Sequence, residues 1–188
     1  MPVWEAIAVL LGIAYLLLAM REQISCWYAA FASTLIYLFL FWDVNLVMES
    51  ALQLYYLGMA IYGWWQWQHG SPDNEKLQIT RWQPRQHLLA VGTVILISAA
   101  SGLLLQTYSD AALPFLDSFT TWGAVLTTWM VARKILENWL YWIVIDSVSI
   151  FLYLDRELYL TAALFAAYVV IVIFGYREWL KHYRATLN

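Results

Sequence analysis

Long apolar segments separated by short polar turns dominate the hydrophobic pattern of this chain. Seven such segments are present, at residues 4–20, 25–42, 47–67, 86–106, 115–132, 138–154 and 158–180. At a rise of 1.5 Å per residue, a helix of about 20 residues crosses the roughly 30 Å hydrocarbon core of a bilayer. The long polar segment at residues 69–85 contains Gly, Pro, Asp and Asn, which predict a loop. The pattern therefore predicts seven transmembrane helices.

The composition supports a membrane environment for these helices. Of the 188 residues, 63% are hydrophobic and 12% are charged, and the mean hydropathy is +0.61. A soluble domain carries about 25% charged residues, so a soluble fold of this size could not bury so much apolar surface. The net charge of −3 and the lack of a basic face exclude nucleic acid as a partner. We expect an all-α integral membrane protein whose main surroundings are the lipid bilayer.

Lysine and arginine are distributed unequally between alternate connections. The turns after the first, third and fifth predicted helices, together with the C-terminal tail, hold nine of the ten basic residues, and the other side holds only Arg156. Cytoplasmic loops of membrane proteins are enriched in Lys and Arg. The asymmetry therefore predicts a multi-pass protein with its N-terminus outside and its C-terminus in the cytoplasm.

An internal repeat relates the first three predicted helices to the last three. Residues 21–67 align without a gap on residues 133–179 at an offset of 112, and 12 of the 47 aligned positions are identical. One linker helix between two three-helix copies gives both copies the same orientation in the membrane. This predicts a 3+1+3 parallel repeat like that of SWEET transporters. The first repeat spans 1–67, the loop and linker helix 68–114, and the second repeat 115–188.

A duplicated block of membrane helices is typical of a transporter whose substrate path lies between the two copies. The alternative is a scaffold without transport, such as the membrane subunit of an enzyme. The sequence contains neither of the nucleotide-binding patterns GxxxxGK[ST] and GxGxxG, and it lacks the zinc-binding pattern HExxH. We therefore expect no enzymatic activity, no cofactor and no metal.

Positions that are identical in the two copies are expected to serve the shared fold. Gly63 and Gly175 would permit close contact between helices, and Trp67 and Trp179 would belong to interfacial aromatic belts. A single ligand site, in contrast, breaks the symmetry between the copies. Polar or aromatic residues with an unlike counterpart are Glu49 (opposite Thr161), Gln53 (Phe165), Asn138 (Cys26), Trp142 (Ala30) and Asp146 (Thr34).

Helical spacing groups these residues into two stripes. Asn138, Trp142 and Asp146 are four residues apart and share one helix face. Glu49, Gln53 and Tyr56 share a face of the helix over 47–67. Asp146 falls at the middle of the bilayer, where a carboxylate is costly unless it is paired or hydrated and so indicates a functional site. The combination of acids, amides and an indole predicts a flat, cationic solute that forms hydrogen bonds.

Each candidate also has a purely structural explanation. Asp146 and Gln53 could form hydrogen bonds with a neighbouring helix. Asn138 could cap its own helix, and Glu49 could be a solvated acid in the first helical turn. Trp142 could serve packing alone.

Two segments of the chain carry a family resemblance: ARKILENWLYWIVID at 132–146 and LQLYYLGMAIYGWWQW at 52–67. They resemble the Pnu family of bacterial vitamin transporters. The segment at 132–146 has the motif E-N-W-x-x-W, followed after three residues by Asn or Asp, and the segment at 52–67 has the motif Q-x-x-Y/F-x-x-x-x-I-Y-G-W. The resemblance covers essentially the whole chain. It implies a SWEET-like fold, a homotrimer in the bacterial inner membrane, and facilitated diffusion (uniport) with later trapping by cytosolic phosphorylation.

The resemblance also implies binding residues on two helices, at Gln53, Asn138, Trp142 and the position of Asp146. Trp122 or Trp129 could add a ring that stacks on the substrate. Members of the family that carry nicotinamide riboside tend to have Asn at the position of Asp146 and lack an acid at Glu49.

These two departures favour thiamine as the substrate. Its thiazolium cation can pair with a carboxylate, and its amino group can donate a hydrogen bond to one. Nicotinamide riboside is also a cation and is the alternative substrate. The predicted binding residues are Glu49, Gln53, Tyr56, Trp122, Asn138, Trp142 and Asp146.

Overall fold

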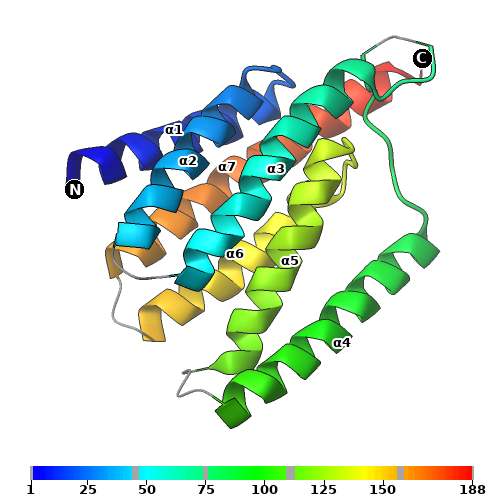
Figure 1. The fold of residues 1–188 in the computed structure, drawn as a ribbon. Helices are drawn as coiled ribbons and strands as arrows, with labels where there is room; N and C mark the ends of the chain where they lie inside the picture. The colour runs from blue at the N-terminus through cyan, green and yellow to red at the C-terminus, as the bar shows by residue number, and fades with distance from the viewer. Residues whose placement is uncertain (1, 44–46, 74–75, 109–112, 156–158, 188) are drawn as a thin grey trace.

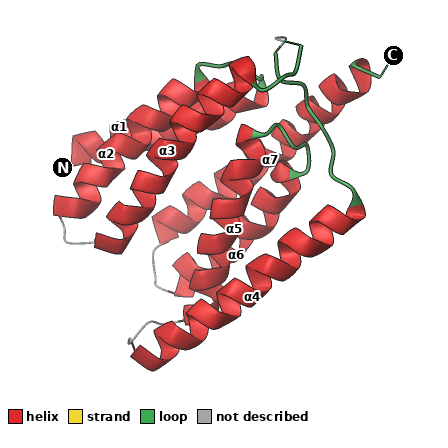
Figure 2. Cartoon of the chain, turned by 45° about the vertical axis from the view of Figure 1, so that its right-hand side comes forward, coloured by secondary structure: helices red, strands yellow, loops and turns green. Residues whose placement is uncertain are grey.

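The structure is a computed structural model that describes residues 2–43, 47–73, 76–108, 113–155 and 159–187 (Figure 1). Over these residues it consists of helices and connecting loops (Figure 2). The helices are α1 Pro2–Met20, α2 Cys26–Asp43, α3 Val47–His69, α4 Pro84–Tyr108, α5 Pro114–Ala132, α6 Asn138–Asp155 and α7 Tyr159–Ala185. The prediction of seven helices is confirmed. The main difference is at α7, which ends at Ala185 rather than at residue 180.

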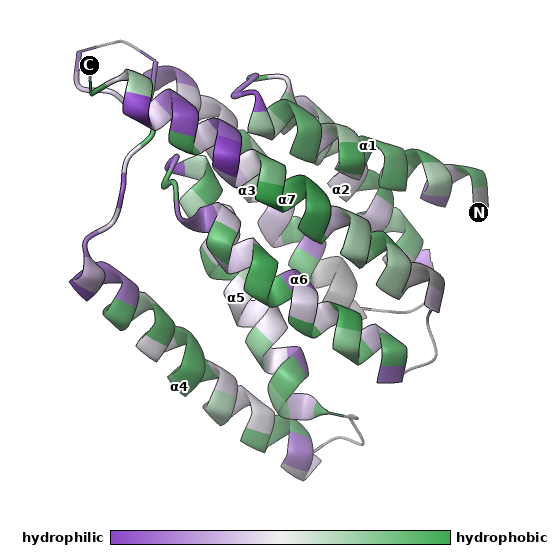
Figure 3. Cartoon of the chain, turned by 180° about the vertical axis from the view of Figure 1, so that it is seen from behind, coloured by the Kyte–Doolittle hydropathy of each residue, from purple (hydrophilic) through white to green (hydrophobic). Residues whose placement is uncertain are grey.

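Hydrophobic residues recur along the described helices, with the hydrophilic ones most frequent near the helix ends and in the loops (Figure 3). In the part of the chain that the structure describes, three segments are both long and apolar enough to cross a membrane: Val3–Met20, Pro84–Tyr108 and Ala162–Ala185. On α4, Leu88, Leu89 and Leu96 each expose more than 70% of their surface. Such a surface is stable in lipid but not in water.

The helices pack as two blocks of three. In the first block α1 packs on α2 and α2 on α3, and in the second block α5 packs on α6 and α6 on α7. The blocks meet where α1 contacts α7 and where α3 contacts α5. The helix α4 packs mainly on α5 and also reaches α6, where His87 forms a hydrogen bond with Tyr141 at 2.9 Å. Figure 1 shows α4 set apart from the other helices. The offset of 112 residues relates α1 to α5 and α3 to α7. It therefore also relates the contact of α1 with α7 to the contact of α5 with α3.

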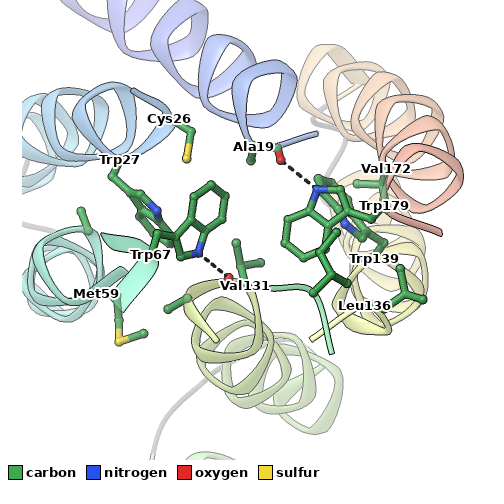
Figure 4. Close-up of a cluster of buried hydrophobic side chains, with 13 residues drawn as sticks. Ala19, Cys26, Trp27, Met59, Trp67, Val131, Leu136, Trp139, Val172 and Trp179 are labelled. Carbon is green, nitrogen blue, oxygen red and sulfur yellow. Dashed lines mark hydrogen bonds between the residues drawn. The ribbon is translucent and has the colours of Figure 1, made fainter. Parts of the chain in front are cut away.

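Four tryptophans form the centre of the packed core (Figure 4). The rings of Trp27 and Trp67 lie 5.4 Å apart at an interplanar angle of 84°, and those of Trp139 and Trp179 lie 5.4 Å apart at 85°. Trp67 and Trp179, 6.1 Å apart, join the two pairs across the block interface. The same edge-to-face geometry thus recurs at positions 112 residues apart.

Hydrogen bonds from two of these indoles cross the block interface (Figure 4). Trp67 Nε1 donates to the carbonyl oxygen of Val131 at 3.1 Å, and Trp179 Nε1 donates to that of Ala19 at 2.9 Å. Ala19 and Val131 are also 112 residues apart. The expectation that Trp67 and Trp179 belong to interfacial belts is wrong, because they are only 3% and 0% exposed.

Gly63 and Gly175 allow the rings of α2 and α6 to pack directly on the backbones of α3 and α7. A Cβ atom at Gly63 would clash with the ring of Trp27, and one at Gly175 would lie 2.5 Å from the ring of Trp139. Both glycines therefore permit a close approach between helices, as their identity in the two copies suggested.

We expect Gly175→Ala to lower the thermal unfolding midpoint in detergent. The added methyl group must displace the ring of Trp139, and overpacking of this kind costs about 1–3 kcal/mol. Gly58→Ala is the matched control, since a Cβ there meets no atom within 4 Å. Equal midpoints for the two variants would contradict this packing.

The loop after α3 is anchored to the turn between α5 and α6. Thr80 pairs with Ile135 in a single parallel bridge, in which the Thr80 amide donates to the Lys134 carbonyl oxygen at 3.0 Å. Arg81 forms an ion pair with Glu137 at 2.9 Å, and this contact raises the pKa of the arginine. The loop therefore covers one end of the second block.

Candidate functional site

Asp146 lies deep inside the helical bundle. It is the ninth residue of α6, about 12 Å along the helix from its start, and it is 5% exposed. Among the described residues, no Lys, Arg or His forms an ion pair with it. Asp146 is therefore a buried carboxylate to which no cation of the described chain is bound.

Tyrosines from two other helices lie within electrostatic range of this carboxylate. The hydroxyl groups of Tyr56 on α3 and Tyr168 on α7 are near enough to Asp146 for electrostatic interaction. Tyr15 on α1 interacts in the same way with Tyr56. Tyr168 also reaches α1, because its hydroxyl would lie 3.5 Å from a Cβ atom at Gly12. We name Tyr15, Tyr56, Asp146 and Tyr168 the central polar group.

The central polar group draws on both blocks and lies at the interface between them. Tyr15 and Tyr56 come from the first block, and Asp146 and Tyr168 come from the second. A carboxylate in a dry interior needs a compensating charge or hydrogen-bond donors, and tyrosine hydroxyls both donate and accept. The group is therefore suited to a ligand that carries a positive charge and several hydrogen-bonding atoms.

Asn138 is fully buried at the start of α6. Its Nδ2 donates to the carbonyl oxygen of Ile135 at 2.7 Å, which fixes the turn before the helix. Its Oδ1 has no hydrogen-bond partner in the part of the chain that the structure describes. Asn138 thus has a structural role at the turn and keeps one free acceptor. It lies two helical turns from Asp146.

Trp142 lies between Asn138 and Asp146 on the same helix face, as the spacing predicts. It is half-buried and packs against the tryptophan core. On α3, Gln53 is half-buried and lies one turn before Tyr56. Glu49 belongs to α3, but its side chain lies outside the described residues.

Trp122 lies on the opposite side of α5 from the centre of the bundle. Its Nε1 donates to Ser101 Oγ of α4 at 3.1 Å, and it is 37% exposed. The α5 residues that are buried instead include Gly123 and Thr127. Trp129 packs at 6.1 Å against Trp82 of the loop. The structure therefore brings neither tryptophan to the central polar group.

Comparison of the two copies did not identify Tyr168 as a site residue. Tyr56 and Tyr168 are identical at equivalent positions, and identity between the copies predicts a role in the shared fold. Two equivalent residues at an interface between repeats can both face the same central ligand. A polar side chain repeated inside an apolar helix is the signal that could have identified Tyr168.

An apolar pocket of about 450 Å³ lies between α4, α5 and α6, and no residue of the central polar group lines it. Its lining includes Phe119, Gly123, Leu126 and Ile145, with His87 and Tyr141 as polar members. None of the predicted binding residues lines it. Among the described residues, no cluster of three His, Cys, Asp or Glu side chains could hold a metal ion.

The comparisons with known proteins agree on one family. The family model described as "Nicotinamide mononucleotide transporter" matches residues 2–181. The nicotinamide riboside transporter PnuC of Escherichia coli (strain K12) is 23% identical over 205 residues, which cover 96% of this chain and 86% of that protein. The riboflavin/roseoflavin transporter RibM of Streptomyces davaonensis is 24% identical over 183 residues, which cover 94% and 84%.

A solved structure supports the same fold. The crystal structure of the vitamin B3 transporter PnuC superposes with a TM-score of 0.74 at 21% sequence identity, covering 97% of this chain and 82% of that one. At this identity the likeness shows the fold alone, whereas the family model spans nearly the whole sequence. The chain therefore belongs to the nicotinamide mononucleotide transporter family, the Pnu-type membrane transporters of vitamins that its sequence motifs resemble.

Proposed function

We propose that this protein carries a cationic, flat vitamin across the inner membrane and binds it at the central polar group. The observation that supports this most is the buried Asp146 carboxylate, to which no cation of the described chain is bound. A positively charged ligand would compensate that carboxylate, and the hydroxyls of Tyr56 and Tyr168 would form hydrogen bonds with its polar atoms.

Nicotinamide riboside is the first candidate substrate. Proteins named as its transporters in Escherichia coli and Haemophilus influenzae are 23% and 25% identical to this chain. Its pyridinium ring would stack on Trp142 and face Asp146. Its carboxamide and ribose would bond to Gln53, Asn138 and the tyrosines.

Thiamine is the second candidate, because Asp146 is an acid where the riboside transporters of the family tend to have Asn. The carboxylate would pair with the thiazolium ring or accept a hydrogen bond from the aminopyrimidine. The expectation that thiamine comes first is revised, because the relatives named above carry nicotinamide riboside or riboflavin.

Titration of tryptophan fluorescence in the purified protein tests these proposals. Nicotinamide riboside is expected to quench the fluorescence with a saturable dependence on concentration. Neutral riboflavin is expected to bind weakly, because it leaves Asp146 uncompensated. Saturable thiamine binding without a riboside response would replace the first candidate by the second. Preferential binding of riboflavin would contradict the proposed cation site.

The Asp146→Asn variant separates the two candidates further. Asparagine keeps the size and one acceptor oxygen, replaces the other oxygen by an NH2 donor and removes the charge, and riboside transporters of the family tend to have it at this position. We expect the variant to bind nicotinamide riboside within about tenfold of the original affinity and thiamine roughly 100-fold more weakly. Equal losses for both ligands, measured by the same titration, would show that this position does not select the substrate.

We further propose a 3+1+3 parallel repeat, with repeats at 1–67 and 115–188 and a loop and linker helix at 68–114. Support comes from the contacts that recur 112 residues apart, including Trp27 with Trp67 and Trp139 with Trp179. The two blocks would rock about the central polar group to open it to each side in turn. The end of the bundle that carries the basic turns after α1 and α5 would face the cytoplasm.

Transport is proposed to be facilitated diffusion by a homotrimer, followed by phosphorylation of the vitamin in the cytosol. Proteoliposomes that contain the purified protein test the first part. Labelled vitamin should enter until the inside and outside concentrations are equal, whether or not a proton gradient is applied. A lack of uptake by a protein that binds the vitamin would favour the alternative of a membrane subunit without transport.

A further inference from the structure

We propose that Glu22 and Lys134 form the ion pair that holds the substrate path closed at the end of the bundle bearing the basic turns. This rests on the proposed alternation between two open states. Lys134 Nζ lies 2.6 Å from Glu22 Oε2. Glu22 belongs to the turn after α1 and Lys134 to the turn after α5, so the contact joins the two blocks. The two residues are 112 positions apart and hence occupy equivalent places in the two blocks.

Neighbouring groups strengthen this ion pair. The second carboxylate oxygen of Glu22 lies 2.6 Å from Nδ1 of His182, which belongs to α7 of the second block. Lys134 Nζ lies 4.6 Å from the centre of the Trp67 ring, within range of a cation–π interaction. The side chains of Lys134 and Glu22 are only 6% and 21% exposed. Breaking a pair so shielded from water leaves an uncompensated charge, which costs more than breaking an ordinary surface ion pair.

The backbone at both positions is strained in the same way. Glu22 has φ 54° and Lys134 has φ 50°, in the left-handed region that favours glycine. The Glu22 amide donates to Ala19 O at 3.0 Å, and the Lys134 amide donates to Val131 O at 3.0 Å, so the two turns share one geometry. A residue other than glycine that is held in this strained conformation suggests that its side chain has a function.

The ion pair lies at the outer side of the tryptophan core. A pocket of about 560 Å³ at this end of the bundle is lined by Glu22, Lys134 and Trp67. Beyond the pair, Trp27 and Trp67 are 2% and 3% exposed. The tryptophans lie near the start of α6, whereas Asp146 lies deeper. The pair and the indoles therefore separate the central polar group from the solvent at this end.

Opening this end requires the two blocks to separate. Glu22 would move with the first block, while Lys134 and His182 would move with the second, so both contacts of the Glu22 carboxylate would break. Removing either charge should therefore favour the open state. Reversing both charges should favour the closed state again, because the two turns have the same backbone geometry.

Cys26 provides a direct probe of this opening, because it is the one cysteine of the chain. It is 0% exposed and lies in the tryptophan core beside Trp27 (Figure 4). In the full-length protein, we expect a membrane-impermeant maleimide to label Cys26 slowly. Glu22→Gln and Lys134→Met should each raise the labelling rate about tenfold. The double variant Glu22→Lys/Lys134→Glu should restore most of the protection.

Two further variants separate gating from loss of structure. Glu178→Gln is the matched control, because the 3.9 Å contact of Glu178 with His182 lies within α7 and does not join the blocks. Its labelling rate should equal that of the original protein. Glu22→Gly removes the carboxylate but relieves the left-handed strain, so it should label rapidly while its thermal midpoint falls less than that of Glu22→Gln.

Unchanged labelling in Glu22→Gln and Lys134→Met would overturn the proposal. The proposal would also be overturned if the labelling rate of Cys26 rose only in variants whose thermal midpoint had fallen, and if Cys26 stayed protected in Glu22→Gly. The labelling experiment needs no vitamin. Its outcome is therefore independent of whether nicotinamide riboside or thiamine is the substrate.

Discussion

Replacing Asp146 by alanine is expected to weaken vitamin binding roughly 100-fold or more. Asp146 is 5% exposed, and the proposed ligand charge would be its compensating partner. Loss of one member of a buried, hydrogen-bonded charge pair costs about 2–5 kcal/mol, and 1.4 kcal/mol corresponds to a factor of ten in affinity. Titration of tryptophan fluorescence measures the effect, and uptake into proteoliposomes should fall in parallel.

Thr34→Ala is the matched control for this experiment. Thr34 occupies the equivalent position in the first block and is also buried, at 9% exposure, but it offers no charge. The affinity of this variant should change less than about threefold, as expected for one neutral hydrogen-bonding group. Similar losses in Asp146→Ala and Thr34→Ala would show that the carboxylate has no special role.

Replacing Trp139 by alanine is expected to cause a large loss of stability. Trp139 is 1% exposed, packs edge-to-face on Trp179, and fills the space over Gly175. Truncation of a buried tryptophan leaves a cavity and costs about 3–5 kcal/mol. The thermal unfolding midpoint in detergent should therefore fall sharply.

The matched control for Trp139→Ala is Trp42→Ala, because Trp42 is 66% exposed near the end of α2. Its removal should shift the midpoint little, since its ring has few packing partners to lose. If the two variants unfold at the same temperature, the tryptophan core does not stabilise the fold in the way that the structure indicates.

The positions of the helices were predictable because each apolar segment is bounded by turn residues or charges. The polar segment over 69–85 likewise contains the loop between α3 and α4, although α3 ends at His69 and α4 begins at Pro84. Hydropathy fixes the length of a membrane helix but not its rotation about its own axis. For that reason the sequence predicted Trp67 and Trp179 at an interface, although both rings are buried between the blocks.

The candidate site was predictable in part. Helical spacing placed Asn138, Trp142 and Asp146 on one face of α6, and the structure has that arrangement. Helical spacing did not show that Trp122 would face α4. In the structure, the small residues Gly123 and Thr127 of α5 are buried instead. Comparison of the copies selects residues that differ, so it passed over Tyr168.

The ion pair between Glu22 and Lys134 has a signal in the sequence that is separate from the polar stripes. These residues carry opposite charges at equivalent positions of the two copies. Equivalent residues near a two-fold axis approach each other, so opposite charges at one repeat position predict a contact between the copies. The substrate itself was not predictable in this way, since both candidate vitamins are cations that suit the same carboxylate.

The central claim is that the Asp146 carboxylate meets the positive charge of the vitamin. The most direct test compares the affinities for a cationic vitamin and a neutral analogue of the same shape, in the original protein and in Asp146→Ala. Nicotinamide riboside can be paired with its dihydro form, and thiamine with an analogue whose thiazolium ring is replaced by thiophene. We predict that the original protein prefers the cation at least about tenfold and that the variant loses this preference. An equal preference in both proteins would contradict the account.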